Sequence, residues 1–306
     1  MRLTRTLALG ASLLVLLSAC ATGGSSKPTI KIGSDRFYEA QVVAELYAQA
    51  LENAGYTVER NLGLGTRAVT AAAIESGQID LKPEYLGSGL AHYDKSKITG
   101  DPATNASALD AILQGKAGGI SVLAWSPGQD GNAFVVRKET ADQLKLTKMS
   151  DLAGVQDQLV WGLPPECATN PVCSGSLKDS YGISFPPKQL KQLDACGAEI
   201  AEALKGKAVD VGELCSTQPE IATMGFVVLE DDKKTQPAEN LAPLVRDELL
   251  NKLSSSDRTA FTALLDSVSA KLTTEALLAL GVAHQIDRKD VPAIARTFLR
   301  DNGLIQ

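Results

Sequence analysis

Short apolar runs alternate with amphipathic segments along most of the chain. Strands are predicted at residues 29–33, 57–61, 79–81, 120–125, 133–137, 159–163, 208–211, 226–230 and 241–245. Helices are predicted after the first strand as far as Gly55, from a turn at 63–66 to Gly77, at 104–116, 140–145, after Ser150, and at 197–205, 256–271, 273–283 and 290–301. Strands separated by helices form βαβ units, so the pattern predicts an α/β fold with mainly parallel sheets.

Two helix starts carry polar residues of interest. Ser34 or Asp35 is expected to cap the first helix, whose apolar face includes Val42 and Leu46. Thr66 and Arg67 begin the next helix, where free N–H groups can bind an anion. A plain helix cap explains the same two residues equally well.

The first twenty residues indicate export. Arg2 and Arg5 precede an apolar run of about eleven residues at 7–17, which is short for a membrane span and typical of a signal peptide. Leu17-Ser18-Ala19-Cys20 resembles the lipobox of bacterial lipoproteins, and a flexible polar segment follows. We therefore expect residues 1–19 to be removed and Cys20 to be lipidated, with 20–28 as a tether. An ordinary secretory signal with a chance cysteine is the alternative.

Charge and hydropathy limit the kinds of partner that the chain can bind. The net charge is −6, and removal of the two leader arginines takes it to about −8. An acidic chain without a basic cluster argues against nucleic acid. No later segment is apolar enough to span a membrane, so the lipid is the expected anchor. The mature length suits two modest cores.

Four cysteines remain after the leader, which in an exported chain predicts two disulfides. Three pairings are possible, and the smallest loops favour Cys167–Cys173 with Cys196–Cys215. A zinc site is the alternative, but there is no paired C-x-x-C and both histidines lie far away in sequence. We expect no metal and no cofactor.

Residues 73–81 and 203–211 repeat one pattern. Each has a helix end, a glycine and a short strand carrying an aspartate, Asp80 or Asp210, which we interpret as structural. The loops that follow hold polar groups. Because ligands of open α/β sheets bind beyond the carboxyl ends of strands, two such units facing each other would line a cleft. Chance similarity of two βα units is the alternative.

Several runs of the sequence are characteristic. They are Ile32-Gly33-Ser34-Asp35-Arg36-Phe37-Tyr38-Glu39, Ile79-Asp80-Leu81-Lys82-Pro83-Glu84-Tyr85-Leu86-Gly87, Cys215-Ser216-Thr217, Val227-Val228-Leu229-Glu230-Asp231-Asp232 and Lys271-Leu272-Thr273-Thr274, among others. These runs resemble the substrate-binding proteins of glycine betaine, choline and proline betaine (osmoprotectant) importers. The likeness runs in order from about residue 30 to 300. It implies a two-lobed periplasmic-binding-protein fold, type II-like, with two hinge strands and a ligand cleft between the lobes. The first lobe would be 29–128 plus 238–306, and the second 129–237.

The resemblance also implies a function. The lobes would close on a small solute and hand it to an ABC permease, the protein being held at the membrane by its lipid and acting as a monomer. A quaternary ammonium group needs aromatic faces, and a betaine carboxylate needs hydrogen-bond donors. Ligand contacts are expected from Ser34, Phe37, Gln41, Thr66, Arg67, Lys82, Tyr85, Asn132, Trp161, Ser216 and Thr217. Pro83 and Gly87 predict that Tyr85 lies in a loop.

The expected aromatic cage is thin. Lys82, Asn132, Cys167 and Cys215 stand where family aromatics are expected, and an ammonium at Lys82 would repel a cationic ligand. A different polar, zwitterionic or aromatic solute is therefore an alternative, as is a sensing lipoprotein that transports nothing. Catalysis is not expected, since neither a Gly-x-Ser-x-Gly elbow nor a Gly-x-x-x-x-Gly-Lys loop is present.

Overall fold

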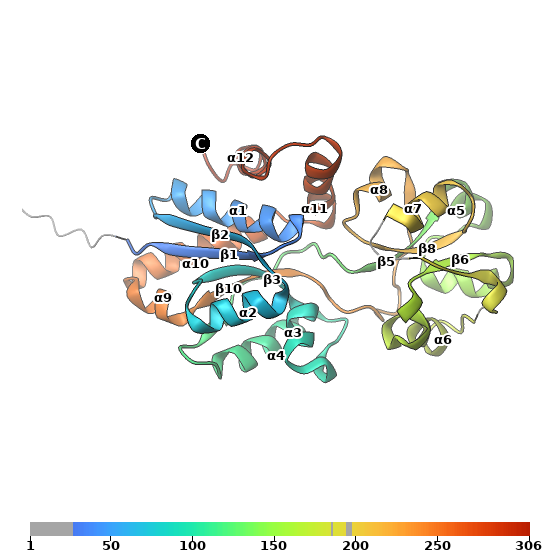
Figure 1. Cartoon of the computed structure of the whole chain (residues 1–306), viewed down its shortest axis with the longest axis horizontal. Helices are drawn as coiled ribbons and strands as arrows, with labels where there is room; N and C mark the ends of the chain where they lie inside the picture. The colour runs from blue at the N-terminus through green and yellow to red at the C-terminus, as the bar shows by residue number, and fades with distance from the viewer. Residues whose placement is uncertain (1–26, 185, 194–197) are drawn as a thin grey trace, which may run out of the picture.

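A computed structural model describes residues 27–184, 186–193 and 198–306. It consists of two α/β lobes, each built on a five-stranded sheet, with two chain segments crossing between them (Figure 1). The signal peptide and Cys20 lie outside the described residues, so both stay predictions. Within the described part of the chain, no helix is long and apolar enough to cross a membrane.

The first lobe has the strand order β2-β1-β3-β10-β4. Its strands are β1 (Ile30–Asp35), β2 (Val58–Gly65), β3 (Leu81–Tyr85), β4 (Ile120–Val122) and β10 (Leu241–Arg246). Its helices are α1 (Tyr38–Asn53), α2 (Arg67–Ser76), α3 (Leu86–Asp94), α4 (Pro102–Gln114), α9 (Asp247–Lys252), α10 (Ser255–Ser269), α11 (Thr274–Gly281) and α12 (Val291–Asp301). Apolar residues of α1, α10, α11 and α12 cover one face, and those of α2, α3 and α4 cover the other (Figure 1).

The second lobe has the strand order β7-β6-β8-β5-β9. Its strands are β5 (Asn132–Arg137), β6 (Trp161–Leu163), β7 (Leu190–Gln192), β8 (Val211–Cys215) and β9 (Phe226–Val228). Its helices are α5 (Lys138–Leu144), α6 (Ser176–Asp179), α7 (Ala198–Lys205) and α8 (Pro219–Thr223). Short 3₁₀ or π-helical turns across both lobes are Lys95–Lys97, Met149–Gly154, Gln156–Gln158, Pro165–Thr169, Pro171–Gly175, Pro187–Gln189 and Val282–Ile286.

The repeat predicted from the sequence occupies the same place in both sheets. β3 and β8 are each third in order, and each pairs with one antiparallel strand, β10 or β5. The carboxylate of Asp80 accepts from the Lys31 amide at 2.9 Å, and that of Asp210 accepts from the Val160 amide at 3.0 Å. These bonds hold the start of one strand to its neighbour. The interpretation of both aspartates as structural agrees with these contacts.

Two crossing segments, residues 123–131 and 229–240, connect the lobes (Figure 1). They pair with each other, since Gln129 and Asn240 form an antiparallel bridge and the Asp130 amide donates to the Glu239 carbonyl at 3.1 Å. The Asn240 side-chain amide donates to the Ser126 carbonyl at 2.9 Å. The predicted lobe boundaries stay predictions, and the strands of the two sheets fall on either side of them.

The prediction of mainly parallel sheets is wrong, because each sheet has two parallel and two antiparallel strand pairings, β10 and β5 running against their neighbours. Two local predictions are also wrong. Ser34 and Asp35 do not cap the first helix, because β1 continues through both, and Phe37 is the N-cap residue without a side-chain bond. Ser34 Oγ instead accepts from the Gly63 amide at 2.9 Å.

The third strand also runs further than predicted. Tyr85 ends β3 rather than lying in a loop, and the helix Leu86–Asp94 was not predicted. Proline usually interrupts a strand because it has no N–H. Here Pro83 faces Pro243 of β10, a pair that exchanges no hydrogen bond and so tolerates both prolines.

Candidate functional site

A cleft of about 500 Å³ lies between the lobes, beyond the carboxyl ends of β1 and β8. We call it the lobe cleft. The first lobe and the first crossing segment line it with Phe37, Tyr38, Glu39, Gln285 and Asp130, and the second lobe with Ala198, Cys215, Thr217, Gln218, Pro219 and Glu220. A solute bound there would touch both lobes, which is the condition for a ligand to favour their closure.

Aromatic rings form one wall of the lobe cleft. Phe37 is 41% exposed, and its ring centroid lies 5.7 Å from that of Tyr85. Tyr38 stacks on His284 with centroids 5.6 Å apart. An exposed ring with a second ring beside it offers π faces to a cation that cannot donate a hydrogen bond.

Carboxyl groups form the floor of the cleft. Glu39 is 2% exposed, and its Oε1 accepts a hydrogen bond from the Tyr85 hydroxyl. Burial, followed by the charge of Asp130, raises the pKa of Glu39 to about 8. Burial also raises the pKa of Asp130, which accepts from the Thr217 amide at 3.2 Å. The charge of Asp130 thus adds to burial in disfavouring the ionisation of Glu39.

Two buried oxygen atoms of the cleft have no hydrogen-bond partner within the described part of the chain. They are Oε2 of Glu39 and Oε2 of Glu220. A buried acceptor without a donor is costly, because it has lost water and gained nothing. A ligand carrying positive charge would compensate both atoms.

Basic groups of the first lobe are engaged by its own carboxylates. Lys82 is 0% exposed, and its Nζ contacts Asp35 Oδ1 at 3.2 Å and Glu84 Oε2 at 2.9 Å. Arg67 Nε contacts Glu84 Oε1 at 3.0 Å. Burial raises the pKa of Glu84, but Lys82 and Arg67 outweigh it and lower that pKa overall. The repulsion expected from Lys82 is therefore neutralised inside the lobe.

The amino end of α3 is occupied in the same way. The Ser88 amide donates to Glu239 Oε2 at 2.9 Å, and its hydroxyl donates to Oε1 at 3.0 Å. Burial raises the pKa of Glu239 to about 7, although the Ser88 hydrogen bonds oppose this. A carboxylate from the crossing segment thus takes donors that a ligand carboxylate would need.

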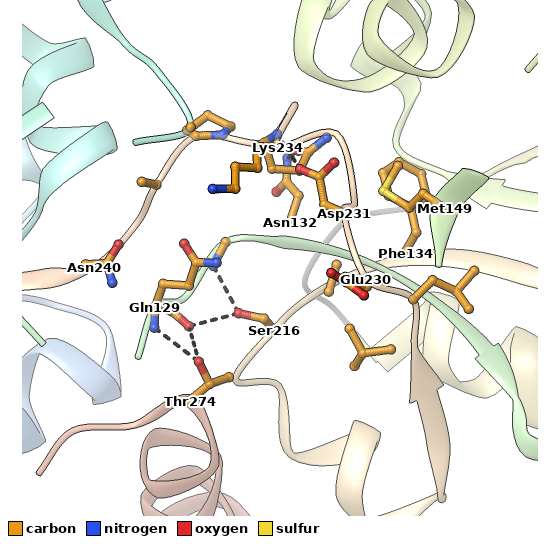
Figure 2. Close-up of a pocket in the computed structure, with 18 of the residues that line it drawn as sticks. Gln129, Asn132, Phe134, Met149, Ser216, Glu230, Asp231, Lys234, Asn240 and Thr274 are labelled. Atoms are coloured by element: carbon orange, nitrogen blue, oxygen red, sulfur yellow. Dashed lines mark hydrogen bonds between the residues drawn. The ribbon is translucent and has the colours of Figure 1, made fainter. Parts of the chain in front are cut away.

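A second cavity, of about 490 Å³, lies along the crossing segments, and we call it the hinge pocket. Figure 2 shows Asn132, Ser216 and Lys234 around it, with Gln129 bonded to Ser216 and Thr274. Ser216 Oγ donates to the Gln129 carbonyl at 3.0 Å. Such bonds tie the crossing segment to both lobes.

The predicted site residues are thus divided among several places. Phe37 and Thr217 line the lobe cleft, and Tyr85 stands behind Phe37. Asn132 and Ser216 line the hinge pocket. Ligand contact by any of these residues stays a prediction.

The other predicted residues have internal partners. Trp161 is 0% exposed and packs in the second-lobe core. Ser34 and Lys82 are buried, and Gln41 donates to the Arg36 carbonyl at 2.7 Å. Thr66 is the N-cap residue of α2 without a side-chain bond, and Arg67 pairs with Glu84.

Of the residues that line the lobe cleft, the predicted ligand contacts included only Phe37 and Thr217. Among those that sequence reasoning missed are Tyr38, Glu39, Asp130 and Glu220. Tyr38 and Glu39 directly follow Phe37. A cleft position for Phe37 therefore implies that the first turn of the next helix, with both residues, also lies beside the cleft. Asp130 precedes β5 in the crossing segment, and no local pattern marks it.

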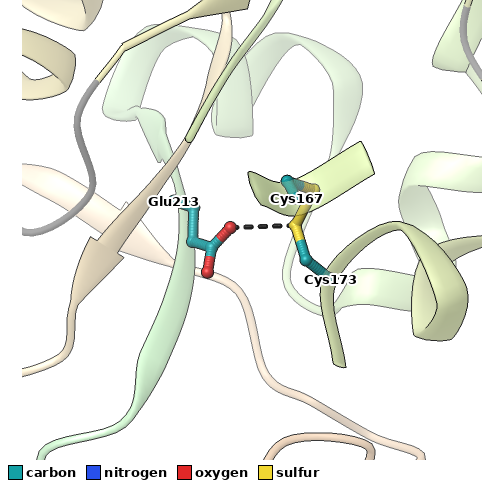
Figure 3. A group of neighbouring side chains, drawn as sticks. All are labelled: Cys167, Cys173 and Glu213. Atoms are coloured by element: carbon teal, nitrogen blue, oxygen red, sulfur yellow. Dashed lines mark hydrogen bonds between the residues drawn. A yellow bond between two sulfur atoms is a disulfide. The ribbon is translucent and has the colours of Figure 1, made fainter. Parts of the chain in front are cut away.

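The cysteines form a separate group in the second lobe. Figure 3 shows Cys167 and Cys173 at disulfide distance, with Cα atoms 5.1 Å apart, beside the buried Glu213. The Cys173 sulfur lies 3.0 Å from Glu213 Oε2. Sulfurs bonded to each other are not thiolates, so this geometry does not offer two metal ligands. Cys196 lies outside the described residues, and its pairing with Cys215 stays a prediction.

Comparisons with known proteins agree with this architecture. The profile of the substrate-binding domain of ABC-type glycine betaine transport systems matches residues 28–301. A glycine-betaine-binding protein of Pseudomonas aeruginosa is 29% identical, covering 93% of this chain and 91% of its own. The carnitine transport binding protein OpuCC of Listeria monocytogenes is 28% identical, covering 95% and 94%.

Solved structures share the fold. Apo YehZ from Escherichia coli has a TM-score of 0.78 at 22% identity and covers 90% of this chain and 99% of its own. A glycine betaine/carnitine/choline ABC transporter structure has a TM-score of 0.79 at 22% identity, covering 90% and 100%. The profile match spans nearly the whole described chain, and the chain belongs to the family of substrate-binding domains of ABC-type glycine betaine transport systems.

Proposed function

We propose that this protein captures a small quaternary ammonium solute in the lobe cleft, closes on it, and delivers it to an ABC permease. The observation that carries the proposal is the pairing of exposed aromatic faces with buried carboxyl groups between two lobes. A quaternary ammonium gains from both, through cation–π attraction and through opposite charge.

The relatives support this class of solute. Curated relatives are named for glycine betaine and carnitine, both of which carry a trimethylammonium group. They favour the osmoprotectant interpretation over an unrelated polar or aromatic solute. The neutralised Lys82 removes the main physical objection to it.

Place and partners follow from the family. Substrate-binding proteins of ABC importers work outside the cytoplasm, and their partner is the membrane permease. The finer statements are part of the proposal: lipidation at Cys20, a flexible tether to the membrane, and a monomeric protein. Radiolabelled palmitate incorporation, lost in Cys20→Ala, tests the anchor.

Titration calorimetry tests capture itself. The mature protein should bind choline, glycine betaine or carnitine at one site per chain, and small-angle scattering should show a smaller radius of gyration with the bound solute. Phe37→Ala should weaken binding at least tenfold, because it removes the exposed ring. An absence of heat with all three solutes, checked by thermal shift, would overturn the proposal.

A further inference from the structure

We propose that the lobe cleft selects solutes with a net positive charge over zwitterions, and that Glu39 is the residue that sets this preference. The inference rests on the proposed function and names its substrate class more narrowly. The expected solute is a quaternary ammonium without a carboxylate, such as choline. Glycine betaine carries the same trimethylammonium group together with a carboxylate, for which the described lining of this cleft offers only neutral donors and no lysine or arginine.

The first step is the charge of the cleft wall. Glu39, Asp130 and Glu220 line it, and no lysine or arginine is among the described residues that do. A zwitterion entering this space would gain at its ammonium end and meet repulsion at its carboxylate end. A cation would gain alone.

The second step is the supply of donors near the cleft. The basic groups at the strand ends of the first lobe are already paired: Lys82 with Asp35 and Glu84, and Arg67 with Glu84. The Ser88 backbone amide, in the first turn of α3, already donates a hydrogen bond to Glu239. A ligand carboxylate would have to displace one of the protein's own carboxylates to reach any of these donors.

The third step is the buried oxygen of Glu39. Oε1 is held by the Tyr85 hydroxyl, which fixes the carboxyl group in place. Oε2 accepts no well-formed hydrogen bond within the described residues, and the Thr217 hydroxyl nearby only partly offsets the effect of burial on the pKa of Glu39. Tyr85 also stands beside Phe37, and both Phe37 and Glu39 line the cleft. An ammonium held against the rings is therefore next to an uncompensated acceptor.

Two basic side chains outside the cleft wall provide the counter-hypothesis. Arg36 is exposed and follows β1, and Lys234 lines the hinge pocket. Neither lines the lobe cleft. If a carboxylate is received after all, Arg36, which directly precedes Phe37 of the cleft wall in the chain, is a basic group that could receive it, so Arg36→Ala belongs in the test.

Protons supply an independent readout. The titratable groups around Glu39 are Tyr85 on β3, Asp130 on the crossing segment, and Tyr38, Glu220 and His284 at the cleft edge. Burial raises the pKa of both Glu39 and Asp130, so a cation that favours their ionised forms must release protons. Choline affinity should therefore rise from pH 6 to pH 9.

Calorimetry with choline and glycine betaine tests the proposal on the full mature protein. Wild-type protein should bind choline at least tenfold more tightly, with proton release measured by comparing buffers of different ionisation enthalpy. Glu39→Gln should lower the affinity for choline at least tenfold and change the affinity for glycine betaine less than threefold. It should also remove most of the pH dependence of choline binding. Glu59→Gln, the same change at an exposed position outside the cleft, should leave both affinities unchanged.

The possible failures are distinguishable. Glycine betaine binding as tightly as choline, or a selective loss of glycine betaine in Arg36→Ala, would overturn the selectivity and leave capture intact. No binding of either solute or of carnitine would overturn the proposed function itself. If Glu39→Gln does not fold, as judged by circular dichroism and melting, Asp130→Asn tests the same charge and should show the same selective loss of choline.

Discussion

Tyr85 donates its hydroxyl hydrogen to Glu39, and this one bond joins the aromatic wall of the lobe cleft to its acidic floor. The ring of Tyr85 lies beside Phe37 at the end of β3, while Glu39 is in the first turn of α1. Two elements of the first lobe, β3 and α1, therefore hold Phe37, Tyr85 and Glu39 in place before any solute binds. Preorganisation of this kind lowers the entropy cost of binding.

Substitution of Tyr85 should separate the ring from the hydroxyl. Tyr85→Ala removes both the ring that stands beside Phe37 and the hydroxyl that fixes Glu39, so affinity for choline should fall about thirtyfold, or about 2 kcal/mol. Tyr85→Phe keeps the ring and should cost less than Tyr85→Ala. Titration calorimetry of the two variants gives the comparison, and equal losses would contradict a role for the ring.

Lys82 should matter for stability and not for binding. Lys82→Met leaves Asp35 and Glu84 buried without their shared cation, and breaking a buried pair costs roughly 3–5 kcal/mol. Urea unfolding should show this loss. The affinity of any folded fraction for choline should stay within threefold of wild type.

Exposed Lys138, paired with Asp142 on the surface of α5, is the matched control. Lys138→Met should change the free energy of unfolding by less than about 1 kcal/mol. A Lys82→Met protein of normal stability with weakened binding would instead place Lys82 in the ligand site, as the sequence analysis expected.

Stability should fall as the pH rises from about 5 to 8. The folded protein holds protons on Glu39, with a pKa of about 8, and on Glu239, with a pKa of about 7, whereas unfolded glutamate has a pKa of 4.5. The native state then binds more protons than the unfolded state, so unfolding becomes easier with increasing pH. Thermal melts across this range measure the slope.

Glu39→Gln should flatten that slope, because an amide stays neutral throughout. Glu239→Gln should flatten its lower part, between about pH 5 and 7. A slope unchanged in both variants would show that neither carboxyl is protonated in the folded protein.

Cysteine pairing is tested by counting thiols. The unreduced mature protein, denatured in the presence of a thiol reagent, should show no free thiol, because lipidation converts the Cys20 sulfur to a thioether, and peptide mapping should find Cys167 joined to Cys173 and Cys196 to Cys215. Two free thiols per chain would leave one predicted bridge without support.

Much of the fold was predictable from the sequence because it depends on local periodicity. The apolar face of α1 and the repeat around Asp80 and Asp210 led to the α/β units and to their equivalence in the two sheets. Proline misled the prediction at β3. Pro83 has no N–H to donate, but it lies opposite Pro243, and this pair needs no hydrogen bond. The pairing depends on two strands that are far apart in sequence.

The site was less predictable, for a related reason. Phe37 was found because it follows a recognisable strand end, and Glu39 was missed although it is two residues away. Whether a lysine repels a cationic ligand depends on its neighbours. The charge of Lys82 is neutralised by an ion pair with Asp35, which is distant in sequence. Asp130 reaches the cleft only because the crossing segment passes it.

A crystal structure of the mature protein with choline tests the central claim most directly. The account predicts closed lobes with the trimethylammonium group against Phe37 and Tyr85 and within contact of Glu39 in the lobe cleft. A solute bound instead in the hinge pocket, beside Asn132 and Lys234, would contradict it.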